Sequence, residues 1–166
     1  TRLLLGGKGI YKIDHVGQAT LLLDTAGSSI RFGIWHGQEL FFSRGGSNSN
    51  TSDIFRLSLD GSVSKIATVE GGATIVAGSQ TSIMLLQSGV ARDANNKTHY
   101  QYSVLSKNGG TPVVVGTTDI VTRASLGAVA TVDSGFLVNL TPRSADGASA
   151  ETVTALTISE SGQIID

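Results

Sequence analysis

Four glycine-containing turns recur along this chain, and each joins two short apolar segments. The turns span residues 14–17, 59–62, 107–110 and 160–163. Their glycines, Gly17, Gly61, Gly109 and Gly162, are separated by 44, 48 and 53 residues. Glycine supplies the positive φ angle that a tight β-hairpin requires. A period of this length is typical of β-propellers, whose blades contain roughly 40 to 50 residues. The turns therefore predict a repeat of β-hairpins.

The segments beside these turns have the pattern of β-strands. Residues 54–59 alternate so that Phe55, Leu57 and Leu59 share one face, as a sheet with one buried face requires. Apolar runs of four to eight residues alternate with Gly, Ser, Asn and Asp clusters, and no stretch keeps an apolar period of 3.6 residues. The chain is therefore predicted to be all-β.

Two more apolar segments lie between successive hairpins, which gives four strands in each unit, the number in a propeller blade. We predict a β-propeller-like fold of about three and a half antiparallel four-stranded blades. The units span approximately residues 1–27, 28–72, 73–118 and 119–166. The first unit lacks room for its first strand. The chain is then part of a larger propeller, or is completed by other copies, or is a four-bladed ring with irregular closure.

One hairpin resembles those of known propeller families. The segment Asp53-Ile54-Phe55-Arg56-Leu57-Ser58-Leu59-Asp60-Gly61-Ser62 is similar to the "IYRxxLDGS" hairpins of TolB-like and low-density-lipoprotein-receptor-like propellers. Residues 8–14 resemble the same hairpin more distantly. The resemblance implies a blade and a protein-binding role, and it implies no catalytic residue.

Composition excludes several classes of protein. The net charge is −1, whereas a nucleic-acid-binding domain normally carries a basic excess. The longest apolar runs are far shorter than the ~20 residues that span a bilayer. Cysteine is absent, and the three histidines show no zinc-binding spacing. We therefore expect no metal, no cofactor, no nucleic acid and no membrane span. The composition weakly favours an extracellular, periplasmic or virion location.

Candidate binding residues lie mainly in long polar loops that occupy equivalent places in the repeat. These loops span residues 44–53, 89–98 and 142–151, and a propeller would place them on one rim. Asn48 and Asn50 lie in the first loop. The second contains Asp93, Asn95 and Asn96, whose oxygen atoms suit a cation but more simply form a solvated turn. Trp35 and His36 lie at a strand end, where the indole ring could contact a sugar.

The sequence nominates no catalytic residue, because no nucleophile and base stand at informative spacing. We expect a non-enzymatic binding or structural module that recognises a protein partner through loops on one propeller rim. Two alternatives remain at this stage. One is a virion or phage-tail structural or receptor-binding protein, and the other is a glycan-binding or glycan-processing protein.

Overall fold

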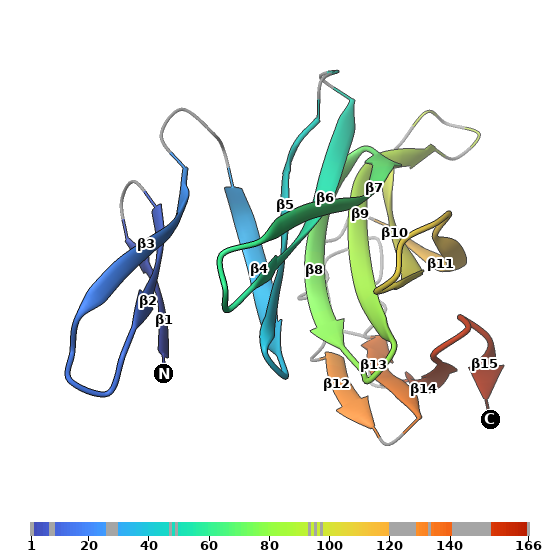
Figure 1. The fold of residues 1–166 in the computed structure, drawn as a ribbon. Coiled ribbons are helices and arrows are strands. Elements are labelled where there is room, and N and C mark those ends of the chain that lie inside the picture. Colours follow the sequence, from blue (N-terminus) through green and yellow to red (C-terminus); the bar gives the residue numbers. More distant parts are fainter. Residues whose placement is uncertain are drawn as a thin grey trace, which may run out of the picture.

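The computed structural model of the chain describes residues 2–6, 9–25, 30–46, 48, 50–92, 94, 96, 98–119, 129–132, 134–140 and 154–165. Within these residues the chain forms fifteen β-strands and no helix, arranged as four separate sheets (Figure 1). The first sheet contains β1 (Arg2–Gly6), β2 (Gly9–Ile13) and β3 (Ala19–Asp24). The second contains β4 (Ile30–His36), β5 (Glu39–Gly45), β6 (Thr51–Ser58) and β7 (Val63–Glu70). The third contains β8 (Gly72–Gly78), β9 (Ser82–Arg92), β10 (Thr98–Ser106) and β11 (Val113–Asp119). The fourth contains β12 (Val129–Val132), β13 (Gly135–Leu140), β14 (Thr154–Ser159) and β15 (Ile164–Ile165).

Each sheet is built from strands that follow one another in the chain, and every neighbouring pair is antiparallel. The turn glycines have the positive φ angles expected of them, from 84° at Gly162 to 91° at Gly61 and Gly109. The prediction of an all-β chain with successive antiparallel four-stranded sheets is confirmed. The first sheet has three strands within the described residues.

Apolar side chains between consecutive sheets form three separate cores. Ile10 of the first sheet packs with Phe42 and Leu57 of the second. Phe41 and Ile54 of the second sheet pack with residues of the third, and the remaining buried members of that core are Val69, Ala73, Ile75, Ile83, Leu85 and Leu105. The core between the third and fourth sheets contains Ala77, Met84, Leu86, Tyr102, Val104, Phe136, Val138 and Ile158. The sheets therefore stack face to face in chain order.

The strands extend further than the sequence predicted into two of the long polar loops. Arg44 pairs with Asp53 and Gly45 with Ser52, so the connection between β5 and β6 shortens to residues 46–50. Strand β9 likewise continues to Arg92, and β10 begins at Thr98. Ladder hydrogen bonds compensate for the low strand propensity of these polar residues. The third loop, 142–151, lies outside the described residues.

The two ends of the stacked sheets differ in their connections. The end that we call the turn rim carries the tight turns, among them 37–38, 59–62, 79–81, 107–112 and 160–163. The opposite end, the loop rim, carries the connections 46–50 and 93–97. Because β5 runs from one rim to the other over seven residues, the rims are separated by roughly 20 Å.

Candidate functional site

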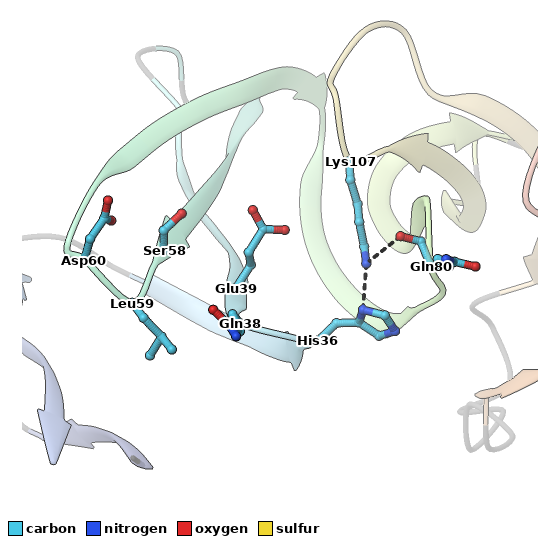
Figure 2. Close-up of a pocket in the computed structure, with 9 residues that line it drawn as sticks. His36, Gln38, Glu39, Ser58, Leu59, Asp60, Gln80 and Lys107 are labelled. Carbon is cyan, nitrogen blue, oxygen red and sulfur yellow. Dashed lines mark hydrogen bonds between the residues drawn. The ribbon is translucent and has the colours of Figure 1, made fainter. Parts of the chain in front are cut away.

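A pocket of about 570 Å³ opens at the turn rim between the second and third sheets. Four turns surround it (Figure 2). The second sheet contributes His36, Gln38 and Glu39 from the β4–β5 turn and Asp60 from the β6–β7 turn. The third sheet contributes the residues that close the other side, which are Gln80 and Lys107. The pocket therefore exists only because the two sheets stack.

Lys107 is the most buried charged residue that lines the pocket, with 8% of its surface exposed. Its Nζ atom lies 2.7 Å from Nδ1 of His36 and donates a hydrogen bond of 3.2 Å to the Gln80 carbonyl oxygen. The same ammonium group lies 5.3 Å from the centre of the Phe41 ring, within the range of a cation–π contact. Since an ammonium group has no acceptor, Nδ1 of His36 accepts its hydrogen bond, and the imidazole proton is on Nε2.

Burial and the neighbouring charges set the protonation of this pair. Burial, followed by the positive charge of Lys107, lowers the pKa of His36, and Glu160 and Glu39 oppose that shift. Burial also lowers the pKa of Lys107, again against Glu39 and Glu160. The lowered pKa of His36 favours a neutral imidazole, which can accept the hydrogen bond from the lysine. The pair is thus a clamp between the second and third sheets.

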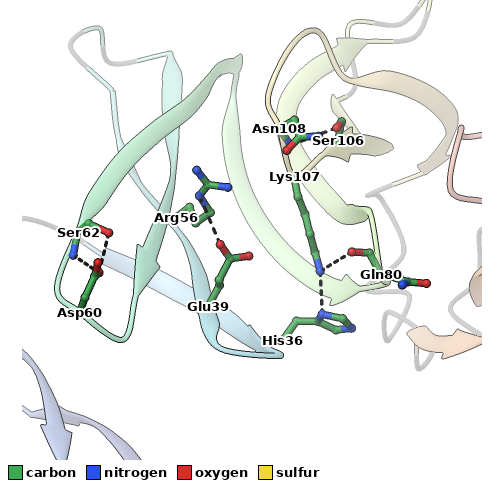
Figure 3. Close-up of polar contacts among 9 residues, drawn as sticks. All are labelled: His36, Glu39, Arg56, Asp60, Ser62, Gln80, Ser106, Lys107 and Asn108. Atoms are coloured by element: carbon green, nitrogen blue, oxygen red, sulfur yellow. Dashed lines mark hydrogen bonds and ion pairs between the residues drawn. The ribbon is translucent and has the colours of Figure 1, made fainter.

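Acidic side chains complete the rim of the pocket (Figure 3). Glu39 forms an ion pair with Arg56, with Oε1 3.6 Å from Nε. Asp60 accepts hydrogen bonds from the backbone and side chain of Ser62, at 2.9 and 2.7 Å. These bonds lower the pKa of Asp60. Asp60 is therefore ionised at neutral pH. Together, Glu39 and Asp60 present hydrogen-bond acceptors in the pocket that Gln38 and Gln80 also line.

A smaller hollow of about 330 Å³ lies at the same rim between the first and second sheets. Lys12, Asp14 and Thr20 line it from the first sheet, and Leu59 and Asp60 line it from the second. The Lys12 ammonium donates a hydrogen bond of 3.3 Å to the Leu59 carbonyl oxygen. Asp60 thus borders both hollows, so the turn rim is a continuous polar surface across three sheets.

The predicted site residues that the structure describes divide between the two rims. Trp35 and His36 end β4 at the turn rim, where His36 lines the pocket and Trp35 is 44% exposed. Asn48 and Asn50 are exposed at the loop rim. Asn96 is also exposed at that rim, with a φ angle of 63°. Asp93 and Asn95 lie outside the described residues.

The two asparagines of the β5–β6 connection also have a role within the fold. The Asn48 carbonyl oxygen accepts hydrogen bonds from the backbone and side chain of Thr51, both at 3.1 Å. The Asn50 carbonyl oxygen accepts a 2.7 Å bond from Gly71, at the crossover to the third sheet. Through their backbones, these residues hold the connection in place.

Sequence reasoning missed Lys107, Gln80, Glu39 and Asp60 as pocket residues. The sequence does mark Lys107 by its position. Like Leu59 and Glu160, it stands two positions before a turn glycine. In the structure all three contact the preceding sheet. The Leu59 oxygen bonds Lys12, Lys107 bonds His36, and Glu160 Oε1 accepts a 3.0 Å bond from the Thr81 backbone.

Among the described residues, no three acidic or histidine side chains are grouped closely enough to hold a metal ion. The same part of the chain contains no helix of the length and apolarity needed to cross a membrane. Comparisons with known protein families, with curated proteins and with solved structures find no match to this chain.

Proposed function

We propose that this chain is a non-enzymatic binding or structural module built from propeller-like blades, with recognition on the turn rim. Two features support the radial arrangement. The first strands of consecutive sheets lie beside one another, β4 next to β8 and β8 next to β12. In a propeller, the first strands of all blades line the central axis.

The turn glycines supply the second feature, because each of three lies against the last strand of the preceding sheet. An added Cβ atom at Gly61 would meet Leu22 of β3, and one at Gly109 would meet Ile66 of β7. At Gly162 it would meet Val113 of β11 at 2.9 Å. The same contact at three successive junctions is what a constant rotation between blades produces.

The observation that carries the binding proposal is the convergence of side chains from four turns on one pocket. The charged groups there are already paired. Lys107 is bonded to His36 and Gln80, Glu39 to Arg56 and Asp60 to Ser62. Such paired groups orient a ligand by hydrogen bonding and leave no activated nucleophile. The mixture of carboxylates and amides suits an uncharged ligand rich in hydroxyl or amide groups.

Amide NMR titrations with a panel of disaccharides and of short uncharged peptides test this proposal. We expect chemical-shift changes at Gln38, Asp60 and Gln80, and their loss in an Asp60→Asn, Gln80→Ala double variant. Asn50→Ala at the loop rim is the matched control and should bind normally. Shifts confined to the loop rim, or no shift with any probe, would contradict recognition on the turn rim.

A glycan ligand is the second candidate, and the exposure of Trp35 favours it. Trp35 pairs with Leu40 across the β4–β5 ladder, so both point to the face that is turned toward the first sheet. Aromatic faces suit the apolar faces of sugars. Because Trp35 is the only tryptophan, intrinsic fluorescence reports on it directly. A glycan that binds at Trp35 should shift the emission, retain binding in Trp35→Phe and lose it in Trp35→Ala. An unchanged affinity in Trp35→Ala would exclude this candidate.

A further inference from the structure

The turn between β6 and β7 belongs to both hollows of the turn rim. Leu59 and Asp60 line the larger pocket with residues of the third sheet, and they line the smaller hollow with residues of the first sheet. In Figure 2, both residues lie on the side of the pocket that is nearest to the first sheet. Packed sheets are roughly 10 Å apart, so the centres of the two hollows, with one sheet between them, are separated by about the same distance.

Two aspartates in these hollows are held in place through one carboxylate oxygen each. Oδ1 of Asp60 accepts both hydrogen bonds from Ser62. In the smaller hollow, Oδ1 of Asp14 accepts hydrogen bonds of 2.9 Å from the backbone amides of Val16 and Gln18. These bonds fix the direction of each carboxylate within its turn. Oδ2 of each side chain can therefore accept a hydrogen bond from a ligand without any rearrangement of the turn.

Uncharged polar side chains continue this surface from one hollow to the other. Thr20 lines the smaller hollow, Gln38 and Gln80 line the larger one, and all three are exposed. Within the part of the chain that the structure describes, no hydrogen bond occupies the Thr20 hydroxyl or the side-chain amides of Gln38 and Gln80. Groups that can bind a ligand thus extend from Thr20 past Asp60 to Gln80, across three sheets.

The charges of the two hollows select an uncharged ligand that is rich in donors. The charged lining groups are three carboxylates and two ammonium groups, which are those of Asp14, Glu39, Asp60, Lys12 and Lys107. Each lysine already donates to a backbone carbonyl oxygen, whereas the carboxylates can only accept. The ammonium groups oppose a cationic ligand, and the carboxylates oppose an anionic one. A hydroxyl group donates a hydrogen bond without carrying a charge.

An extended peptide fits this surface less well than a sugar chain does. A peptide that binds by strand addition needs an exposed strand edge, and a proline-rich peptide needs a groove lined by aromatic rings. The hollows lie among turns, and none of the described residues that line them is a phenylalanine, tyrosine or tryptophan. Hydroxyl groups repeated along a neutral chain are instead characteristic of oligosaccharides.

We propose that the turn rim binds a neutral oligosaccharide that spans both hollows, with Asp60 at its middle. This inference rests on the turn-rim recognition proposed above and names its ligand. Sugar units in the larger pocket contact Gln38 and Gln80, and units in the smaller hollow contact Thr20 and Asp14. A disaccharide occupies the larger pocket alone. A longer chain engages both hollows at once, so its affinity is higher.

Titration calorimetry and amide NMR with neutral oligosaccharides of the cellulose, starch and chitin series test this span. In the series that binds, the hexasaccharide should bind about tenfold more tightly than the disaccharide, because it adds hydrogen bonds in the smaller hollow. It should shift the amide signal of Thr20 as well as that of Gln80, and the disaccharide should shift only the latter. An Asp14→Asn, Thr20→Ala double variant should lose the tenfold gain and keep the disaccharide affinity. Asparagine retains the Oδ1 atom that holds the turn.

Two variants serve as controls for this loss. Thr111→Ala changes an exposed threonine of the same rim that lines neither hollow, so the gain should persist. Trp35 also lines neither hollow. Trp35→Ala should therefore keep the gain, which separates this site from the contact at Trp35 considered above. An unchanged amide spectrum of the double variant outside the smaller hollow shows that it remains folded.

The outcomes separate this inference from the proposal on which it rests. A disaccharide that shifts Gln38 and Gln80, with no gain in the hexasaccharide, would leave recognition on the turn rim standing and overturn the span. A gain that survives in the double variant would also overturn the span. Binding of short uncharged peptides but of no saccharide would overturn the ligand class alone. No shift with any probe would contradict both proposals.

Discussion

At the scale of single residues, the His36–Lys107 clamp makes stability depend on pH. The folded state lowers the pKa of His36 below its ordinary value of 6.5. As the pH falls below that value, the unfolded chain takes up a proton that the folded chain resists. The clamp therefore contributes fully above about pH 6.5, and its contribution is lost below it. Glu160 has a lowered pKa as well, but its loss begins only below its ordinary 4.5.

We therefore expect the free energy of unfolding to fall between pH 7 and pH 5 in the unmodified chain and to fall less in His36→Gln. The glutamine cannot be protonated, but it still offers an oxygen to Lys107. Urea titrations at pH 5, 6 and 7 measure the difference. Equal slopes with pH in the two proteins would show that the imidazole is not held neutral.

Buried serines connect the second and third sheets. The Ser52 hydroxyl donates to the Gly71 carbonyl oxygen and accepts from the Ala73 backbone, both at 2.9 Å. Ser52→Ala leaves two groups unpaired near the core, and we expect a loss of about 1–3 kcal/mol in unfolding free energy. Ser64→Ala on β7 is the control and should stay within about 0.5 kcal/mol. Equal stabilities of the two variants in urea would refute this role.

The burial of these hydroxyl groups could not be predicted from the sequence. A serine in a strand reads as a solvent-facing residue, yet Ser43, Ser52 and Ser103 are 0–2% exposed. Their partners are distant in the chain. Ser43, for example, donates a 2.6 Å bond to the carbonyl oxygen of Ala73, 30 residues away. Lys107 was missed for the same reason, because its partners His36 and Phe41 belong to another sheet.

At the scale of the elements, the turn glycines Gly109 and Gly162 are required twice, for their φ angles and for the close contact with the preceding sheet. Gly109 and its neighbour Gly110 separate the two requirements. Both have positive φ, at 91° and 113°, but only at Gly109 would a Cβ atom collide with the Ile66 carbonyl oxygen.

Gly110→Ala should therefore lower the free energy of unfolding only through backbone strain, by about 1–3 kcal/mol. Gly109→Ala should lower it clearly more, because the collision is added to the strain. Chemical unfolding of the two variants, compared with the unmodified chain, measures both costs. If Gly109→Ala were no less stable than Gly110→Ala, the turn would not lie against β7.

Strands were easier to predict than the connections between them. Alternation within residues 54–59 was sufficient to place β6, but the expectation of a single buried face was wrong, because Leu57 packs toward the first sheet and Ile54 toward the third. The polar ends of β5 and β9 carry no such alternation, and their ladder partners alone make them strands. The sequence analysis therefore overestimated the length of these two loops.

At the scale of the whole molecule, the 44- to 53-residue spacing of the turn glycines predicted successive four-stranded sheets, which the structure shows. The order in which the sheets stack follows from burial. Leu57, Leu105 and Ile158 are apolar in the sequence, but only the cores show which neighbouring sheet each one faces. The pocket depends on that stacking, so its residues could not be grouped from sequence alone.

Paired spin labels test the central claim of a constant rotation between sheets most directly. Val16, Asp60, Asn108 and Ser161 each precede a turn glycine and are exposed. The chain has no cysteine, so introduced cysteine pairs label cleanly, and dilution with unlabelled chain isolates distances within one copy. We predict one common distance for the three neighbouring pairs and one common, longer distance for the pairs 16–108 and 60–161. Unequal distances within either set would contradict the propeller-like arrangement.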